Sequence, residues 1–311
     1  MKEKRIIFMG TPSFAEMVLR KIVEANYNVV AVVTQPDRKV GRKQVLTFSE
    51  VKKYALSQNI LLLQPERISS NLLQLKDLQP DLIITCAYGQ FLPQAILELP
   101  NIRCINIHAS LLPKLRGGAP IHHAIIQGHK KTGISIMEMA RAMDGGPVAY
   151  QREITITNDD NVLTLHDKLA VLAGDMIVEF LPEILNNQAQ FLPQDESLAS
   201  YAYNISAEDE FISFQDDYQK VYNQIRGLIP WPVGYGLIED LKIKFHQVAF
   251  SNEITNAADG TILPGDQDGI KVAVSNQVLL LKEVQFAGKR KISAQEFYFG
   301  QGQNLVGKRF K

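Results

Sequence analysis

Residues 5–22 read RIIFMGTPSFAEMVLRKI, and this stretch sets the pattern for the first half of the chain. Residues 5–9 form a short apolar run that stops at Gly10-Thr11-Pro12, which is typical of a buried strand that ends in a turn. After the turn, SFAE at 13–16 has a capping-box pattern, and apolar residues recur at helical spacing as far as Ile22. The stretch therefore predicts a strand followed by a helix.

The same alternation of apolar runs with patterned stretches continues to about residue 185. Continuous Val/Ile/Leu strands separated by helices indicate a mostly parallel sheet that is buried on both faces, an α/β fold. The last helix of this layer is expected from about Val162 to Leu185. The further strands are expected at 28–34, 60–65, 81–88, 104–108, 133–139 and 147–154.

The pattern changes near residue 186, where the chain becomes polar and irregular. Beyond that point, short alternating stretches broken by Gly, Asn and Pro follow one expected helix near 217–225, as in a small antiparallel barrel. A chain of 311 residues is also too long for one ordinary core. We therefore expect a first domain at 1–188, a linker at 189–206 and a second domain at 207–311.

Composition excludes several classes of protein. Lys plus Arg and Asp plus Glu number 33 each, so any footprint for nucleic acid must be local. The two cysteines, Cys86 and Cys104, lie in apolar runs, as expected for buried thiols in a reducing compartment. The N-terminus has only four apolar residues before Gly10, and no run approaches a membrane span. We expect a soluble, cytoplasmic protein.

Candidate catalytic residues lie where the run at 104–108, CINIH, meets a loop. A strand's period of two places Asn106 and His108 on one face, where an amide can donate to an oxyanion and an imidazole can move a proton. Asp144 follows the strand expected at 133–139 and can bring a carboxylate to the same edge. Taken singly, these residues are more often packing, capping or turn residues, so spacing leaves both interpretations open.

Other chemistries fit the sequence less well. Ser110 lacks the Gly-x-Ser-x-Gly elbow of hydrolases, and the turn after residue 9 lacks the Gly-x-Gly-x-x-Gly spacing of dinucleotide sites. Cys104 has the surroundings of a core cysteine rather than a nucleophile. The adjacent His122 and His123 face different ways on a helix, so no metal is expected.

Residues 106–121 read NIHASLLPKLRGGAPI, which resembles the signature of the folate-dependent formyltransferases. Asp144 in MDGGP falls where that family carries its catalytic aspartate. The resemblance implies a Rossmann-like catalytic domain and an OB-like C-terminal domain. It implies transfer of a formyl group from 10-formyltetrahydrofolate to the α-amine of methionine on initiator tRNA, with Asn106 and His108 stabilising the oxyanion and Asp144 setting the charge of His108.

The resemblance also implies where the substrates bind. It implies no metal, and we expect the chain to be a monomer. The tRNA would be held by cations in a loop after the second strand and in the C-terminal domain. The folate residues implied are Ser110, Leu111, Leu112, Pro113, Tyr88, Gly89 and Gln90, and the tRNA residues are Arg38, Lys39, Arg42, Lys43, Lys289, Arg290 and Lys291.

Two alternatives remain at this point. One is a folate-dependent formyltransferase that acts on glycinamide ribonucleotide or an amino sugar nucleotide; the second domain and the basic stretch at 38–43 favour tRNA instead. The other is a non-catalytic RNA-binding protein. The presence of Asn106, His108 and Asp144 together argues against it, because binding alone does not require all three.

Overall fold

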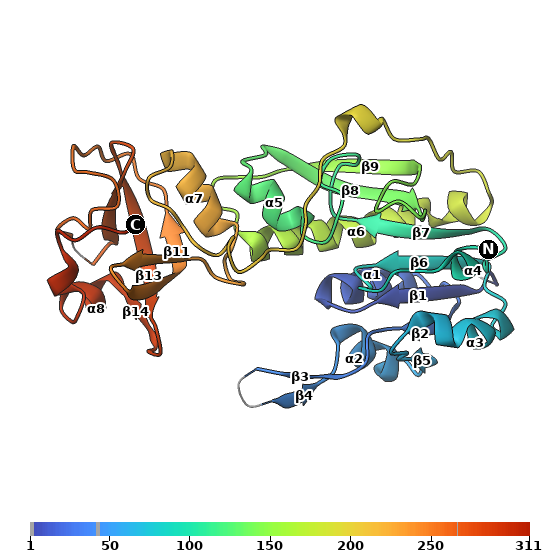
Figure 1. Ribbon diagram of the computed structural model, residues 1–311. Helices are drawn as coiled ribbons and strands as arrows, with labels where there is room; N and C mark the ends of the chain where they lie inside the picture. The colour runs from blue at the N-terminus through green and yellow to red at the C-terminus, as the bar shows by residue number, and fades with distance from the viewer. Residues whose placement is uncertain (1–2, 42–43, 266) are drawn as a thin grey trace. The chain divides into compact units, whose positions relative to one another are not determined.

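The structure, a computed structural model, describes residues 3–41, 44–265 and 267–311. The chain divides into two compact units (Figure 1). Each unit has its own hydrophobic core. Unit 1 comprises residues 1–117, 132–154 and 166–201, and unit 2 comprises residues 118–131, 155–165 and 202–311.

Unit 1 is built on a seven-stranded sheet with the strand order β5-β2-β1-β6-β7-β8-β9. The pairs from β5 to β7 are parallel, and β8 joins β7 in the antiparallel direction. Figure 1 shows β1, β6 and β7 side by side at the centre. The parallel sheet with an antiparallel edge confirms the α/β prediction. The strands are β1 (Ile6–Gly10), β2 (Val29–Val33), β5 (Leu62–Leu63), β6 (Leu82–Cys86), β7 (Arg103–His108), β8 (Lys131–Glu138) and β9 (Val148–Thr155).

The central strands of this sheet are buried because their apolar side chains are covered on both faces. Every residue of β1 and β6 is buried, as continuous apolar strands of a parallel sheet require. Helix α6 covers the range predicted for it. The helices of unit 1 are α1 (Ser13–Glu24), α2 (Glu50–Ser57), α3 (Leu72–Asp77), α4 (Gln94–Leu97) and α6 (Val162–Leu185), with short 3-10 turns at Ile68–Asn71 and Glu196–Leu198.

The start of α1 differs from the prediction. The N-cap is Pro12, and Ser13 is the first helical residue rather than a capping serine. The predicted capping box is therefore wrong, because a capping side chain must sit on a residue that is still extended. The Ser13 hydroxyl instead lies 3.4 Å from His166 Nε2 on α6.

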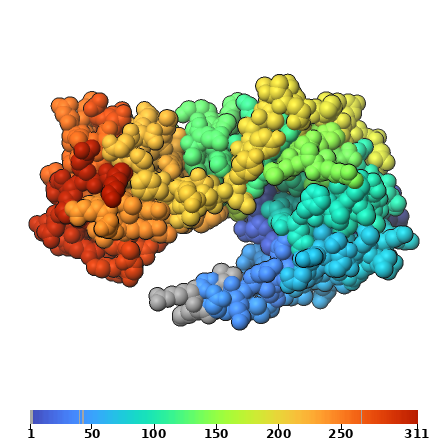
Figure 2. Space-filling view, in the orientation of Figure 1, coloured from blue at the N-terminus to red at the C-terminus, as the bar shows by residue number. Residues whose placement is uncertain are grey.

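The basic stretch after β2 also differs from the loop that was expected. Arg38–Val40 (β3) and Val45–Thr47 (β4) pair as a small antiparallel hairpin, with Arg38 opposite Thr47. Arg42 and Lys43 lie outside the described residues. The hairpin, coloured blue, lies on the surface of unit 1 (Figure 2), and its β4 side chains are exposed.

Unit 2 contains an antiparallel sheet with the order β10-β11-β13-β12 and β14 paired to β13, consistent with the predicted barrel-like domain. Its core includes Phe214 and Phe310, which stack with ring centroids 4.7 Å apart. The side chain of Asp217 caps α7 by accepting a hydrogen bond from the backbone N–H of Gln219. The helix begins at Tyr218, one residue after the predicted start. The elements are α5 (Pro120–Ile126), α7 (Tyr218–Arg226), β10 (Tyr235–Ile238), β11 (Leu241–Ala249), β12 (Ile270–Val274), β13 (Gln277–Phe286), β14 (Lys291–Ser293), α8 (Ala294–Tyr298) and a 3-10 turn at Gln303–Leu305.

Among the residues that the structure describes, none of the helices combines the length and the apolar character needed to cross a membrane.

Candidate active site

The candidate site lies at the carboxyl ends of β6 and β7, where ligands bind in open parallel sheets. Thr85 on β6 pairs in register with Asn106 on β7, and His108 is the last residue of β7. The strand's alternation places Asn106 and His108 on one face, as predicted. Asn106 is partly exposed, whereas His108 is buried with 6% of its surface accessible.

Asp144 completes the group from the segment between β8 and β9. Its carboxylate lies 3.4 Å from Asn106 Nδ2 through Oδ1 and 3.6 Å from His108 Nδ1 through Oδ2. Asp144 has a left-handed backbone conformation, with φ of 46°, which is uncommon for a residue other than glycine. The structure thus brings together the three residues that spacing had placed at one sheet edge.

The His108 ring is held at both nitrogens. Nε2 lies 3.0 Å from the carbonyl oxygen of Leu115, and because a carbonyl only accepts, Nε2 carries a hydrogen. Nδ1 faces the Asp144 carboxylate. Both ring nitrogens therefore face oxygen atoms, which fixes the orientation of the ring.

The Asp144 carboxylate has one further donor. The backbone N–H of Gly117 donates to Oδ2 at 2.8 Å, and 17% of the Asp144 side chain is exposed. A carboxylate so placed orients an amide and an imidazole toward the same space. An amide donor beside an imidazole suits an oxyanion that forms during acyl transfer, and the carboxylate can assist a proton transfer.

A thiol nucleophile does not fit the site. Cys104 and Cys86 are both buried, and burial raises the pKa of each thiol well above its usual range. A thiol with a raised pKa carries little of the reactive thiolate. Among the described residues, no cluster of three or more His, Cys, Asp or Glu side chains has the arrangement of a metal site.

The turn at 110–113, where folate was expected, is hydrogen-bonded to Ser135 on β8. Ser135 Oγ donates to the carbonyl of Ser110 at 2.6 Å and accepts from the backbone N–H of Leu112 at 3.1 Å. Ser110 Oγ in turn donates to the carbonyl of Lys114 at 2.6 Å. Ser110 and Leu112 are buried, and Leu111 and Pro113 are partly exposed. The turn is therefore held by hydrogen bonds to β8 and by one bond within the loop.

The second expected folate segment, residues 88–90, is also held within unit 1. The Tyr88 carbonyl accepts hydrogen bonds from Thr11 Oγ1 at 3.0 Å and Gln35 Nε2 at 3.1 Å. Burial raises the pKa of Tyr88 to about 12, and its hydroxyl has no hydrogen-bond partner among the described residues. Gly89 has φ of 86°, and the Gln90 side chain accepts from the Ile68 backbone N–H at 2.8 Å.

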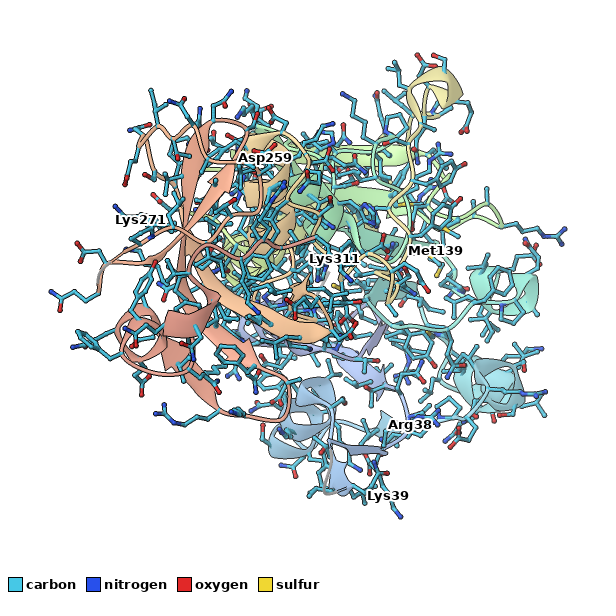
Figure 3. The ribbon with its side chains drawn as sticks, turned by 60° about the vertical axis from the view of Figure 1, so that its left-hand side comes forward. Arg38, Lys39, Met139, Asp259, Lys271 and Lys311 are labelled. Atoms are coloured by element: carbon cyan, nitrogen blue, oxygen red, sulfur yellow. The ribbon has the colours of Figure 1, made fainter. Side chains whose placement is uncertain are left out.

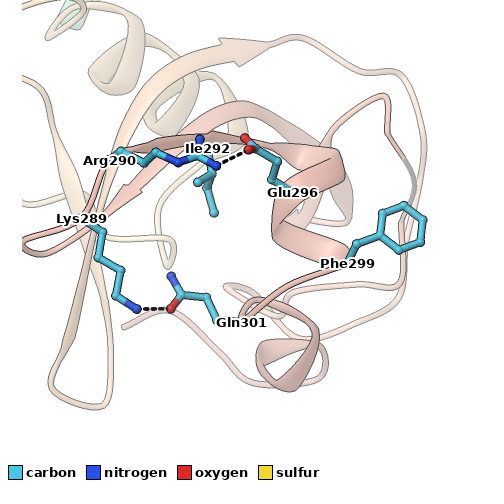
Figure 4. Close-up of a pocket in the computed structure, with 6 residues that line it drawn as sticks. All are labelled: Lys289, Arg290, Ile292, Glu296, Phe299 and Gln301. Carbon is cyan, nitrogen blue, oxygen red and sulfur yellow. Dashed lines mark hydrogen bonds and ion pairs between the residues drawn. The ribbon is translucent and has the colours of Figure 1, made fainter.

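The cations expected to bind tRNA lie on the surfaces of the two units. Arg38 and Lys39 are exposed on β3 (Figure 3), and Arg38 pairs with Glu66 at 3.4 Å. In unit 2, Lys289 contacts Gln301 and Arg290 contacts Glu296 at a cavity of about 490 Å³ (Figure 4). Lys291 pairs with Glu283 at 3.5 Å. The cavity is lined by Lys289, Arg290, Ile292, Glu296, Phe299 and Gln301.

Three residues that hold the site were missed by the sequence reasoning: Thr85, Arg116 and Gln194. Thr85 Oγ1 lies 2.9 Å from Asn106 Oδ1, and Gln194 Nε2 donates to the Asp144 carbonyl at 2.7 Å. Arg116 lies within the signature stretch 106–121, which by itself assigns it no role. Gln194 begins the polar stretch QDESLASYA at 194–202, which also resembles the family, but it was expected to belong to a linker and no role was predicted for it.

Comparisons with known proteins match both parts of the chain to one family. The family model described as "Formyl transferase" matches residues 4–181, and "Formyl transferase, C-terminal domain" matches residues 204–302. The methionyl-tRNA formyltransferase of Staphylococcus aureus (strain Newman) is 46% identical over 310 residues, which cover 98% of this chain and 99% of that protein. The protein of the same name from Enterococcus faecalis is 44% identical over 307 residues and 98% of each chain.

A solved structure shows the same fold at lower identity. The N-formyltransferase from Helicobacter canadensis, in complex with folinic acid and dTDP-3-aminofucose, superposes with a TM-score of 0.69. Its sequence is 17% identical, and the match covers 92% of this chain and all of that one.

Proposed function

The chain belongs to the methionyl-tRNA formyltransferases, and we infer that it transfers the formyl group of 10-formyltetrahydrofolate to the α-amino group of methionyl-tRNA. It is therefore an enzyme that prepares the initiator tRNA for translation. The observation that assigns the reaction to particular side chains is the meeting of Asn106, His108 and Asp144 at the end of the sheet.

The three side chains suit the charges that this reaction creates. The donor supplies a formyl group whose carbon the amine attacks, with one proton lost from the amine and one gained at the folate nitrogen. Asn106 Nδ2, which has a second hydrogen beyond the one directed at Asp144, would donate to the formyl oxygen as it becomes an oxyanion, and the His108 ring beside it would help to stabilise that charge. Asp144 would hold both side chains and assist removal of the proton from the amine.

Folate binding is proposed at the two strand-end segments, Ser110–Pro113 and Tyr88–Gln90. Both follow strands, β7 and β6, whose carboxyl ends flank Asn106. In open sheets with parallel strands, ligands bind in the crevice beyond these ends. The buried Tyr88 hydroxyl makes a side-chain contact less suitable than one through the backbone.

The tRNA is proposed to bind through cations on both units. The exposed Arg38 and Lys39, with Arg42 and Lys43 in the same stretch, supply charge from unit 1. Lys289, Arg290 and Lys291 supply it from unit 2, beside the exposed Phe299. Such cations bind phosphates and release counterions, which favours a nucleic acid even though the chain has no net charge.

We also keep the proposed division into a catalytic domain at 1–188, a linker at 189–206 and a tRNA-binding domain at 207–311. The protein is proposed to act as a monomer in the cytoplasm, where initiator tRNA is charged. A single sedimenting species at the mass of one chain would support the first of these statements.

The test is an acceptor assay with the purified full chain and 10-formyltetrahydrofolate labelled in the formyl group. Label should move to methionyl-tRNA, and His108→Ala should lower the rate about 10²- to 10⁴-fold. His246→Ala, a substitution of the same residue type on β11, should leave the rate unchanged. Full activity in His108→Ala would contradict the assigned mechanism.

The same assay separates the alternatives. A nucleotide-linked amino sugar is offered in a parallel reaction. Label on the sugar and none on tRNA would overturn the acceptor assignment. Binding of tRNA without any transfer of label would indicate a protein that keeps the fold without the reaction.

A further inference from the structure

The side-chain amide of Gln194 links the turn that carries Asp144 to Arg116. Its Nε2 donates to the Asp144 carbonyl and to the Gly146 carbonyl, each at 2.7 Å. Its Oε1 accepts from Arg116 Nε at 3.1 Å and from Arg116 Nη2 at 2.8 Å. Both donors and the acceptor of this amide are therefore used inside unit 1.

The orientation of the Gln194 amide follows from these four contacts. A rotated amide would set its oxygen against two carbonyl oxygens and its nitrogen against the guanidinium. All four contacts would then be repulsive, so Arg116 determines which way Gln194 points. The amide in turn bridges the carbonyls of Asp144 and Gly146, on either side of Gly145.

Arg116 is itself fixed on two sides. Glu196 accepts from Nη1 at 2.9 Å and from Nη2 at 2.8 Å, and only 3% of the Arg116 side chain is exposed. The Arg116 backbone N–H donates to the Ser200 carbonyl at 2.8 Å. The next residue, Gly117, donates its N–H to Asp144 Oδ2. Arg116 is thus linked to Asp144 through its side chain and through its neighbour's backbone.

The Asp144 turn needs such support because its conformation is uncommon and its space is limited. Asp144 has φ of 46°, and a Cβ built at Gly146 would lie 1.9 Å from the Glu138 carbonyl oxygen. The carboxylate has to stay near both Asn106 and His108, whose separation from it is already 3.4 Å and 3.6 Å. A small rotation of the turn would break one of these contacts.

We propose that Arg116 and Gln194 are positioning residues of the transfer reaction: they hold the Asp144 turn so that its carboxylate reaches Asn106 and His108. Neither side chain touches those two residues, so both act through Asp144. The guanidinium is required because it presents donors in a fixed fork, which a lysine ammonium does not. This inference rests on the proposed function.

The first test uses Gln194→Ala and Gln194→Glu. Both should lower kcat about 10- to 100-fold, because misplacing a reactive group by about 1 Å costs up to about 10²-fold. The KM values for methionyl-tRNA and 10-formyltetrahydrofolate should stay within about twofold, since the substrates' own contacts remain. Gln190→Ala, an exposed glutamine in the same segment, is the matched control and should retain kcat.

A double-mutant cycle separates positioning from general structural damage. Single-turnover rates are measured for Asp144→Asn with and without Gln194→Ala. If Gln194 acts through Asp144, its substitution should change the rate less than twofold in the Asp144→Asn background. An equal fall in both backgrounds would overturn the proposal, as would an unchanged kcat in folded Gln194→Ala.

Arg116 offers a second measurement that does not require Gln194→Ala to fold. Arg116→Ala should lose kcat and recover it when methylguanidinium is added at millimolar concentration, whereas methylammonium should have no effect. Equal recovery with both cations, or with neither, would contradict the role assigned to the fork. A wild-type chain that formylates no acceptor would instead refute the proposed function, whatever these variants do.

Discussion

Thr85 Oγ1 lies 2.9 Å from Asn106 Oδ1 and 3.0 Å from the Ile105 carbonyl oxygen. The hydroxyl has one hydrogen, and a bond to Asn106 Oδ1 leaves Nδ2 of that amide directed at Asp144. If Thr85 accepted from a rotated Asn106 instead, the amide oxygen would face the carboxylate. The Asp144 carboxylate, which only accepts, therefore excludes the rotated amide, and Thr85 supports the remaining orientation by donating to Asn106 Oδ1.

Thr85→Val removes this hydroxyl without changing the volume of the side chain. We expect kcat to fall about tenfold, the equivalent of about 1.4 kcal/mol at the transition state. Thr85→Ser keeps the hydroxyl and should retain most of the rate. Formylation kinetics with methionyl-tRNA measure both, and equal rates for the valine and serine variants would show that the hydroxyl has no part in the reaction.

Tyr88→Phe should not weaken the protein. The Tyr88 hydroxyl is buried without a partner among the described residues, and leaving a polar group in that state costs free energy. We expect the free energy of unfolding to be unchanged or up to about 1 kcal/mol higher, as measured in urea. The KM for 10-formyltetrahydrofolate should not change, because the hydroxyl is shielded. A tenfold rise in that KM would show that the hydroxyl meets the folate.

Lys39→Ala tests the basic hairpin of unit 1. Lys39 is exposed on β3, and removing one phosphate contact should weaken tRNA binding and lower the slope of log K against log salt by about 0.7 to 0.9. Lys53→Ala, an exposed lysine on α2 that pairs with Glu50 at 2.6 Å, is the control. Binding is measured by filter retention from low to moderate salt. An unchanged slope in Lys39→Ala would remove this residue from the tRNA contacts.

The stability of unit 2 should depend on pH through the titration of His122. Burial lowers the pKa of His122, although the Trp231 carbonyl, 3.3 Å from Nε2, opposes the shift. A depressed pKa means that the unfolded chain binds a proton first, so the stability contributed by the neutral ring is present above about pH 6.5 and decreases as the pH falls below it.

His122→Gln should therefore reduce the loss of stability between pH 7.5 and 5.5, as measured by urea unfolding followed through Trp231 fluorescence. His129→Gln, a histidine on the segment that follows α5, is the comparison. An identical pH dependence in His122→Gln and the wild type would rule out His122 as the titrating group.

Arg226→Leu should destabilise unit 2 strongly. Arg226 is 6% exposed, and its guanidinium donates to the carbonyls of Thr157 at 2.8 Å and Asp160 at 2.6 Å. Its loss leaves both carbonyls without that donor, and because the bond to the Asp160 carbonyl is buried this should cost about 1 to 3 kcal/mol. Lys220→Leu, an exposed position on the same helix, should cost less than about 0.5 kcal/mol. Equal unfolding midpoints for the two variants would contradict this account.

Several features were predictable because they depend on local pattern. Continuous apolar runs placed β1, β6 and β7 in a parallel sheet, and the period of a strand placed Asn106 and His108 on one face. The resemblance of 106–121 to the formyltransferase signature indicated the reaction, and the close relatives confirm it. The capping box at Ser13 was wrong because Pro12 already occupies the capping position. The hairpin at 38–47 was missed because its strands have only three residues each.

The sequence by itself determined which side chains arrive at one end of the sheet: an amide, an imidazole and a carboxylate. Only the tertiary structure decided how those groups are held. Gln194 is 50 residues from Asp144 and 78 from Arg116, and Thr85 is 21 residues from Asn106. Hydrogen bonds of 2.7–3.1 Å between such distant positions have no periodic signature, because they depend on where the folded backbone places each carbonyl and amide.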